Sequence, residues 1–413
     1  MEEEGRHPLN IAVSIGGLAF LILIHEAGHF FVALAVRMRP RRFYIFFPPA
    51  LVKRVHNGIE YGIGSIPLGG YVKIPGMHKP AAGDLDAQFG RALDEAPWLE
   101  RHIAPVKAAL DESRLEDARA ALSELRAAVE RAGLSEPARR SAERGLNDVD
   151  DGLSGDAYWR APVWKRVAVI LAGPGTNLVF AVVLLAAVFM LGVPKAVLPV
   201  VDKVDPGTPA ARILQPGDRV VAVDGKRVSA VQIAQRIRAS GGRPIELTVV
   251  RDSQRLTVNA RPVLQDGAYR LGFALSLQYR KYGPLAAFRL AIGRTWEVTR
   301  AIGESLGRLV TGSGRKDVAS PVGIVQASSQ TLEVDYREYL GVLALISLSL
   351  ALLNLLPFLP LDGGHVAFSL AEGIRGRAIS REAYERASVV GIVLVLFLFF
   401  IGLSNDVDRL RGG

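Results

Sequence analysis

Three ionisable residues lie inside a long apolar stretch near the start of this 413-residue chain. The run from Ile11 to Val36 contains His25, Glu26 and His29 in the order His-Glu-x-x-His and is otherwise apolar. A helix needs about 20 apolar residues to cross a bilayer, so the run is long enough to do so. An ionisable side chain at that depth costs about 3 kcal/mol unless it is paired, bound to a metal or facing a cavity. The sequence therefore predicts a membrane helix whose polar groups have partners.

The spacing of the two histidines is typical of metal ligands on a helix. His25 and His29 are four residues apart, so they share one face and can bind one Zn²⁺, with Glu26 beside them as a base for water. The alternative is a buried helix on which the same residues have ordinary polar contacts. The apolar surroundings disfavour it, because a membrane penalises each polar group that lacks a partner. A third ligand would complete the metal site.

The composition agrees with a membrane protein. Hydrophobic residues make up 49% of the chain, which fits several spans together with soluble parts. With no cysteine, a disulfide framework is excluded. The net charge of +9 could indicate nucleic-acid binding, but basic cytoplasmic loops explain it more simply. We expect the lipid bilayer, and no nucleic acid, among the partners.

Three further apolar segments are candidate spans. Together with residues 1–36 they cover 161–192, 338–362 and 387–413, the last including a tail, and 363–386 is then a cytoplasmic loop. By the positive-inside rule, the arginines directly after the first span place its C-terminal end in the cytoplasm and both termini outside: Arg37, Arg39, Arg41 and Arg42. The predicted fold class is a polytopic α-helical membrane protein with four transmembrane helices.

Two different segments separate the first two spans. Residues 37–79 carry short β-type runs with a predicted turn at Gly69-Gly70, and such a membrane-associated β-loop could hold a peptide extended beside Tyr71 by strand addition. An ordinary cytoplasmic hairpin fits the pattern equally well. Residues 80–160 have apolar residues at helical spacings and predict a cytoplasmic helical insertion; examples are Leu115, Leu122, Leu125 and Val129.

The second span and the segments after it carry other motifs. GPGTN, residues 173–177, permits close helix packing and places the polar Asn177 at membrane depth, where it needs a partner. Residues 193–278 contain short strands, a turn at Asp224-Gly225 and one predicted helix, a pattern that resembles an extracytoplasmic PDZ domain. Residues 279–337 predict an amphipathic helix and a linker.

The third span ends in NLLPFLPLDGGH, residues 354–365. Pro357 and Pro360 interrupt the helix, so irregular backbone can direct Asp362 toward the histidines. A His₂Asp set leaves a fourth position for water, as catalytic zinc requires. Asn354 could bind the substrate backbone or be a helix cap, and His365 is expected at the interface rather than as a ligand.

Together these motifs resemble the site-2 protease family, of the bacterial RseP and RasP type. HEAGH, GPGTN, one PDZ-like unit, SPVGI at 320–324 and NLLPFLPLDGG occur in the family's order over nearly the whole chain. The chain departs in its large 80–160 insertion, in its single PDZ-like unit where RseP has two, and in Ser320, where the family has glycine. The resemblance implies that His25, His29 and Asp362 bind zinc, that Glu26 is the catalytic acid and base, and that 62–74 is the family's β-loop.

The resemblance also implies a function. It predicts a zinc-dependent endopeptidase of the bacterial inner membrane that acts in regulated intramembrane proteolysis. Its substrates would be single-pass membrane proteins already trimmed by another protease, such as anti-sigma factors or signal-peptide remnants. The substrate-binding residues would be Asn354, Gly69, Gly70, Tyr71 and Asn177, and the PDZ-like domain would exclude long ectodomains.

Two alternatives come from other classes. A catalytically idle scaffold that binds partners through the PDZ-like domain would need neither Glu26 nor an open zinc position. A zinc or proton transporter could use intramembrane His and Asp, but would more often show repeat-related broken helices, and no such repeat is visible.

Overall fold

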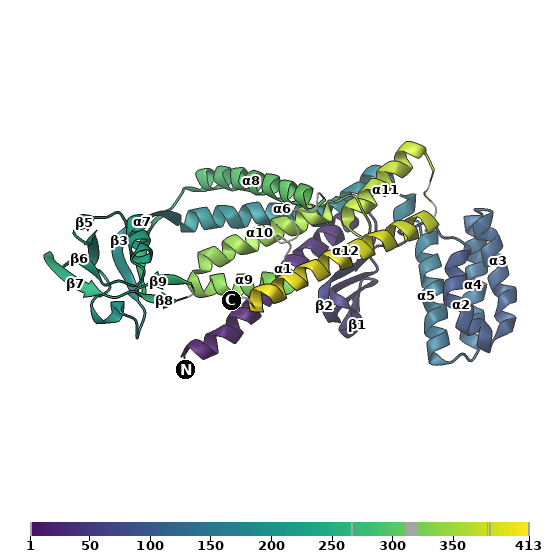
Figure 1. Cartoon of the computed structure of the whole chain (residues 1–413). Helices are drawn as coiled ribbons and strands as arrows, with labels where there is room; N and C mark the ends of the chain where they lie inside the picture. The colour runs from purple at the N-terminus through teal and green to yellow at the C-terminus, as the bar shows by residue number, and fades with distance from the viewer. Residues whose placement is uncertain (1, 266, 311–319, 378, 380, 412–413) are drawn as a thin grey trace. The chain divides into compact units, whose positions relative to one another are not determined.

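The computed structural model describes residues 2–265, 267–310, 320–377, 379 and 381–411, most of them helical. The chain forms two compact units. The first contains Met1–Val182 and Thr295–Asp406, and the second contains Val183–Arg294 and Val407–Gly413. Figure 1 labels the elements along the chain.

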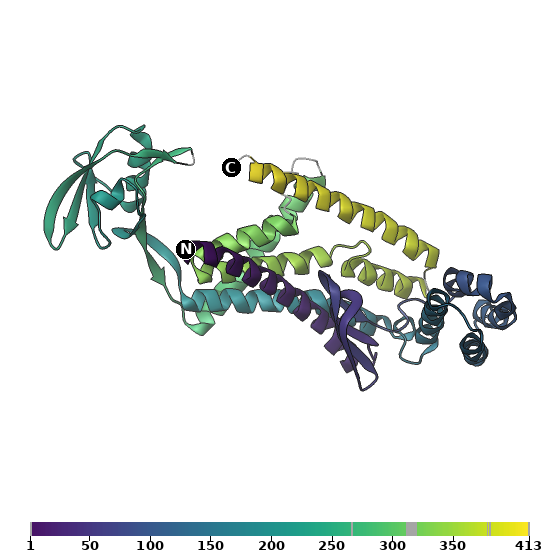
Figure 2. The same cartoon turned by 90° about the horizontal axis from the view of Figure 1, so that it is seen from below.

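Four helices among the described residues are long and apolar enough to cross a membrane. They are α1 (Glu2–Ala35), α6 (Val163–Leu191), α10 (Tyr336–Asn354) and α12 (Arg381–Arg411). In the first unit α1 contacts α10, and both contact α9 (Pro321–Val334); Figure 2 shows α1 beside α10 from a second side. The four predicted spans each correspond to one of these helices.

The third of these helices is shorter than predicted. It ends at Asn354 rather than near 362, because Pro357 and Pro360 cannot donate the hydrogen bonds that would continue it. A new helix, α11 (Asp362–Arg375), begins directly after this break. The prediction of a loop over 363–386 was therefore wrong for most of the segment, which belongs to α11 and the start of α12.

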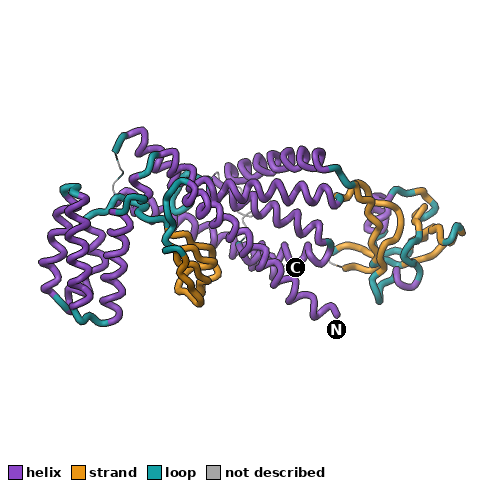
Figure 3. The backbone as a smooth tube through the Cα atoms, turned by 180° about the vertical axis from the view of Figure 1, so that it is seen from behind, coloured by secondary structure: helices purple, strands orange, loops and turns teal. Residues whose placement is uncertain are grey.

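The β-loop is a small antiparallel sheet formed by β1 (Arg42–His56) and β2 (Ile59–Lys73), drawn in orange beside the helices in Figure 3. Its turn lies at Asn57-Gly58, where both residues have positive φ, so the predicted turn at Gly69-Gly70 was wrong. Those glycines lie inside β2. Residues 42–45 pair with 60–63 and also with 70–73, so among the described strands 70–73 is an outer edge.

The insertion is a group of antiparallel helices with a core of its own. Its helices are α2 (Gly83–Glu95), α3 (Glu100–Asp111), α4 (Leu115–Arg131) and α5 (Glu136–Leu153), with 3₁₀ turns at Pro97–Leu99 and Tyr158–Arg160. The helical periodicity that predicted it also built this core, since Leu122, Leu125 and Val129 are buried against Phe89 and Leu146.

The second unit contains a six-stranded sheet of order β10-β3-β4-β6-β7, with β5 paired to β4. One helix, α7 (Ala230–Ala239), supplies Ile233 and Ile237 to the core of the sheet. The predicted turn at Asp224-Gly225 is confirmed, since both residues have positive φ between β4 and β5. The strands are β3 (Val193–Val204), β4 (Arg219–Val223), β5 (Lys226–Arg227), β6 (Ile245–Arg251), β7 (Gln254–Ala260), β8 (Val263–Gln265), β9 (Ala268–Arg270) and β10 (Phe273–Arg280).

The predicted amphipathic helix is α8 (Pro284–Val310). Part of the predicted linker, 311–319, lies outside the described residues. Ser320, the first residue of SPVGI, immediately precedes α9. The backbone N–H groups of Ser320 and Gly323 both donate to the carboxylate of Asp406 in α12, at 2.8 and 3.2 Å. The motif therefore begins a helix whose first amides are bound by a carboxylate from the last helix.

Candidate metal centre

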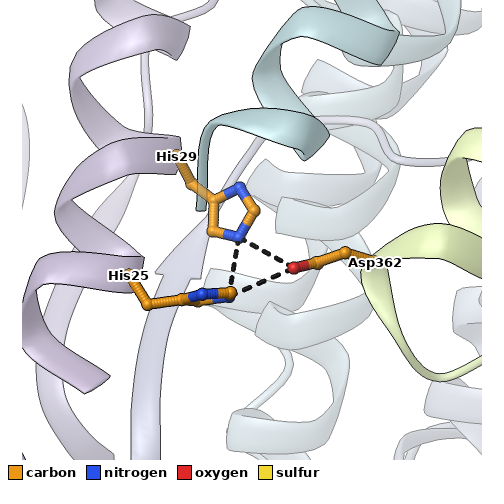
Figure 4. Close-up of side chains that lie close together, drawn as sticks. All are labelled: His25, His29 and Asp362. Carbon is orange, nitrogen blue, oxygen red and sulfur yellow. Dashed lines mark hydrogen bonds and ion pairs between the residues drawn. The ribbon is translucent and has the colours of Figure 1, made fainter. Parts of the chain in front are cut away.

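His25 and His29 project from one face of α1 toward Asp362, the first residue of α11 (Figure 4). The Nε2 atoms of the two imidazoles are 3.2 Å apart. The Oδ2 atom of Asp362 lies 3.1 Å from Nε2 of His25 and 3.3 Å from Nε2 of His29. Both histidines are buried, with 9% and 6% of their surface exposed. One oxygen and two nitrogens thus converge on one point.

Glycines bring Asp362 to this position. A Cβ atom on Gly363 would lie 2.3 Å from the carbonyl oxygen of Leu355, and one on Gly364 would lie 2.4 Å from the backbone nitrogen of Leu359. Any larger residue would push the start of α11 away from the irregular backbone that precedes it. The Gly-Gly pair therefore permits close packing of the start of α11 against the segment that precedes it.

The far end of α11 is fixed by polar contacts with the start of α6 and the segment before it. The side chains of Tyr158 and Ser369 are hydrogen-bonded at 2.9 Å. Arg166 of α6 forms an ion pair with Glu372, and both side chains are mostly buried. The second carboxylate oxygen of Glu372 accepts from the backbone of Ile379 at 2.8 Å. These contacts hold the helix that carries Asp362, and sequence reasoning missed them because they join distant segments.

Helix α6 orients His29. The Nδ1–H group of His29 donates to the carbonyl oxygen of Val169 at 2.9 Å, which leaves Nε2 free to bind a metal. Gly173 lies directly against the ring, since a Cβ atom there would be 2.3 Å from Nε2. Gly28 in turn packs on the carbonyl oxygen of Ala172. Gly173 of the GPGTN motif thus lets α6 approach the histidines, and α6 stays helical through Pro174.

Asn177 has a different place from the one predicted. We expected it at the substrate, but it is fully buried and faces Nδ1 of His25 at 3.4 Å. Its Oδ1 atom has no hydrogen-bonding partner among the described residues. Turning the amide over would let Oδ1 accept from Nδ1–H of His25 and leave Nε2 of that ring free for a metal. This position suits a residue that orients His25.

The three converging atoms fit a zinc ion. In a tetrahedral site with bonds of about 2.0–2.2 Å, two ligand atoms lie about 3.3–3.6 Å apart, close to the 3.1, 3.2 and 3.3 Å found here. Two imidazoles and a carboxylate are also a donor set that zinc accepts. Oδ2 of Asp362 is buried without a conventional hydrogen bond, so a cation would supply the partner that it lacks.

Glu26 lies beside this group and meets the edge of the β-loop. A Cβ atom on Gly70 would be 2.3 Å from Cγ of Glu26. The backbone of Val72 also forms a hydrogen bond with the carboxylate. Gly70 therefore makes room for Glu26, which explains a glycine inside a strand better than the predicted turn does.

The remaining predicted residues lie in β2, at the end of α10 and in α11. Gly69 and Tyr71 flank Gly70 in β2, and both are half-buried. Asn354 is the half-buried last residue of α10, at the start of the break that leads to Asp362. The ring of His365 lies 6.2 Å from that of Tyr384 in α12, and His365 is not in the metal-ligand group formed by the described residues.

Comparisons with known proteins cover nearly the whole chain. The profile of Peptidase family M50 matches residues 13–398. The zinc metalloprotease RasP of Bacillus licheniformis is 29% identical over 94% of this chain and 96% of its own length. The regulator of sigma-E protease RseP of Salmonella typhimurium is 29% identical over 97% of this chain and 99% of its own length. A solved PDZ domain of an SdrC-like protein from Listeria monocytogenes matches 20% of this chain and 90% of that domain, with 19% identity and a TM-score of 0.18.

Proposed function

The chain belongs to Peptidase family M50 and is a zinc metalloprotease of the site-2 protease type, and on this premise we propose that it hydrolyses peptide bonds within the membrane. The observation that carries the proposal is the convergence of His25, His29 and Asp362, whose ligand atoms all lie within 4.8 Å of one another. Two of these residues are on an apolar helix long enough to span a bilayer. We therefore assign the reacting group to membrane depth.

The three convergent residues would hold the zinc ion, and Glu26 would move the protons. A bound zinc ion supplies Lewis acidity that polarises the scissile carbonyl and activates water. Glu26 takes the proton of the attacking water and later gives it to the leaving amine. The carbonyl of Val169 and the side chain of Asn177 hold the two imidazoles in the orientation that presents Nε2. Cleavage also requires a group of residues that holds the substrate backbone in place beside Glu26.

The outer edge of the β-loop would hold the substrate backbone. Residues 70–73 pair on one side with 42–45, so the other side can accept an extended chain by strand addition. This edge touches Glu26 through Gly70. A transmembrane helix that is unwound here would present its backbone next to the catalytic group. We assign Gly69, Gly70 and Tyr71 to this surface, with Asn354 as a hydrogen-bonding group for the substrate.

The substrate class that we propose is the one that the family resemblance implies. We propose single-pass membrane proteins that another protease has already trimmed, among them anti-sigma factors or signal-peptide remnants. The β-rich second unit would act as a PDZ-like size filter outside the cytoplasm. It has a cavity of about 370 Å³ beside α7, lined in part by Ile233, Ile237 and Leu271. The arginines after α1 support a cytoplasmic position for that end of the helix and extracytoplasmic termini.

The protein is a membrane protein, and we place it in the bacterial inner membrane. The domain boundaries that we propose are the predicted ones, except that the third span ends at Asn354 and that α11 and the start of α12 replace most of the loop. The 80–160 insertion, with its charged surface, is assigned to the cytoplasm together with the β-loop. This placement puts the catalytic residues near the cytoplasmic end of α1.

The decisive experiment measures zinc content and peptide cleavage in the same preparations. Purified wild-type protein, Glu26→Gln and the control Glu130→Gln, on the exposed surface of α4, are incubated in detergent with a tagged, trimmed single-pass substrate. We expect about one zinc ion per chain in all three and cleavage by the wild type and the control alone. Undiminished cleavage by Glu26→Gln, or a wild type without zinc, would contradict the proposal. Zinc without cleavage of any trimmed substrate would favour a scaffold.

A further inference from the structure

Two cationic side chains lie at the base of the β-loop. Arg41 immediately precedes β1, and Lys73 is the last residue of β2. The backbone N–H of Arg41 donates to the carbonyl oxygen of Lys73 at 2.7 Å, so the two residues are neighbours across the sheet. Both side chains point to the same element of the insertion, the end of α5.

Three carboxylates there bind these two cations. Asp151 accepts from Nε of Arg41 at 2.9 Å and lies 2.9 Å from Nζ of Lys73. Asp156 binds two nitrogens of the Arg41 guanidinium, each at 3.0 Å, and Asp148 lies 2.8 Å from Nζ of Lys73. Asp151 is 13% exposed, Lys73 21% and Arg41 30%. A partly buried network with a bidentate arginine is worth more than isolated surface pairs.

Backbone contacts reinforce the same junction. The N–H groups of Tyr158 and Trp159 donate to the carbonyl oxygens of Pro75 and Gly76, at 2.9 and 3.1 Å. Gly76 has a φ of +56°, and a Cβ atom there would be 2.9 Å from the carbonyl oxygen of Asp151. The chain that leaves the β-loop is thus joined to the chain that leaves the insertion.

The side of β2 that faces the insertion also borders a cavity. Its volume is about 700 Å³, and it is bordered by Lys73 and Val72 of β2, Asp148 of α5, Gln88 of α2 and Val389 of α12. The ion pairs link the end of β2 to the insertion beside this cavity, together with the backbone contacts above and the apolar contact of Ile74 with the cluster that contains Tyr158. We call Arg41, Lys73, Asp148, Asp151 and Asp156 the hairpin clamp, a name used below for the five charged residues alone.

The hairpin clamp is close to the catalytic group along a single strand. Gly70, which packs on Glu26, is three residues before Lys73, or about 10 Å along a strand. Val72, which hydrogen-bonds to Glu26, is adjacent to Lys73. A shift at the clamp would therefore move the strand edge relative to Glu26.

We propose that Asp151 and Lys73 are positioning residues: through them the helical insertion sets where β2, and hence a substrate backbone held on its edge, lies relative to Glu26. This assignment rests on the proposed function. It gives a role to the insertion, which itself contains no catalytic group. Displacement of reacting groups by about 1 Å can cost a hundredfold in rate, so a modest loosening of this strand is enough to affect cleavage.

The contacts of the clamp favour the charged forms of Lys73 and Asp156. Burial alone would lower the pKa of Lys73, but its hydrogen bonds to Asp148 and Asp151 raise it above the ordinary value. Burial likewise would raise the pKa of Asp156, and the bidentate contact with Arg41 lowers it. Lys73 and Asp156 therefore stay ionised under the conditions of a cleavage assay.

The test uses full-length Lys73→Gln and Asp151→Asn, with Lys73→Arg as the conservative variant. The control is Asp150→Asn, the residue next to Asp151, which faces Arg126 within the insertion instead. Zinc content, kcat, KM and the identity of the cleaved bond are measured on a trimmed substrate. Hydrogen exchange of residues 69–73 is measured on the same proteins without substrate.

For Lys73→Gln and Asp151→Asn we expect an unchanged zinc content and a kcat that is lower by about tenfold, which corresponds to about 1.4 kcal/mol. Cleavage should spread over neighbouring peptide bonds, and the backbone amides of β2 should exchange faster. Lys73→Arg and Asp150→Asn should resemble the wild type. Wild-type exchange and an unchanged cleaved bond in both variants would overturn the assignment and leave the proposed function intact. If these two variants lost zinc in proportion to their activity, the assignment would also be overturned, because the defect would then lie in the metal centre. If the wild type itself cleaves nothing, the proposed function fails. Hydrogen exchange of β2 in the variants still tests whether the ion pairs of the clamp hold this strand in place.

Discussion

The ring of His29 lies so close to Gly173 that a Cβ atom on the glycine would stand 2.3 Å from Nε2 and 2.6 Å from Cε1. Real Cβ atoms do not approach other atoms this closely. An alanine at this position must therefore displace either the imidazole or helix α6. Since Nε2 is the atom that faces Asp362, any displacement acts on the metal centre.

We predict that Gly173→Ala loses zinc and cleavage together. The displaced ring would no longer bring its Nε2 to 3.3 Å from Oδ2 of Asp362. The measurement is metal content by mass spectrometry of the purified protein, alongside cleavage. Gly175→Ala is the matched control, because a Cβ atom there meets nothing within 4 Å and the helix gains a better former. Normal zinc in Gly173→Ala would refute the close contact.

Asn177→Leu should weaken zinc binding without unfolding the helices. Leucine has the same number of side-chain heavy atoms, branched at the same carbon, but cannot hydrogen-bond to Nδ1 of His25, so that ring would lose the contact that orients it. Loss of such an outer contact typically lowers metal affinity by about tenfold to a hundredfold. Competition with a calibrated chelator measures the affinity, and Ser349→Ala in α10 serves as a control for a polar deletion within a span. An unchanged affinity would assign Asn177 to helix packing alone.

The sequence predicted the parts of the site that depend on local periodicity. His25 and His29 share a face because a helix repeats every 3.6 residues, and the prolines before Asp362 indicated a break in the chain. The contacts of Val169, Gly173 and Ser369 could not be predicted in this way, because each depends on how α1, α6 and α11 pack. The GPGTN motif did signal close packing, but not the group against which it packs.

Two expectations about secondary structure, the turn at Gly69-Gly70 and the end of the third span, were corrected by the structure for different physical reasons. Gly69-Gly70 has the composition of a turn, yet Gly70 is small because Glu26 occupies the space where its side chain would be. The apolar run after Asn354 has the hydropathy of a span, yet Pro357 and Pro360 end the helix there. At Gly70 a constraint from the site overrode the local propensity, whereas at Pro357 and Pro360 a local signal ended the helix before the apolar run ended.

The second unit should lose stability at acid pH through Asp218. The guanidinium of Arg251 binds both carboxylate oxygens, at 2.8 and 2.7 Å. These hydrogen bonds lower the pKa of Asp218, against the opposing effect of burial. The folded-state pKa lies below the unfolded value of about 3.9. The ion pair therefore contributes its full share to the free energy of unfolding above that value, and this contribution disappears as the pH falls through the lower, folded-state pKa.

Hydrogen exchange of β4 and β6 in the full chain measures this contribution. Asp218→Asn should exchange about tenfold faster at neutral pH and respond less than the wild type when the pH is lowered. Asp252→Asn is the control: Asp252 is exposed at the turn after β6 with a φ of +47°, a conformation that asparagine tolerates. Equal protection from exchange in Asp218→Asn and the wild type at neutral pH would show that the ion pair does not stabilise the second unit.

Removal of the second unit's sheet tests the size filter, and the register of the strands shows where to cut. Val197 of β3 and Leu277 of β10 are paired neighbours in an antiparallel ladder, so their backbones are about 5 Å apart. Residues 198–276 can therefore be replaced by an Asn-Gly turn without stretching the chain.

If this unit excludes long ectodomains, the shortened protein should cleave an untrimmed substrate nearly as fast as a trimmed one, whereas the full chain should prefer the trimmed one. Cleavage of the trimmed substrate controls for an intact metal centre. Discrimination that survives the deletion would place the filter elsewhere, at the β-loop or between the membrane helices.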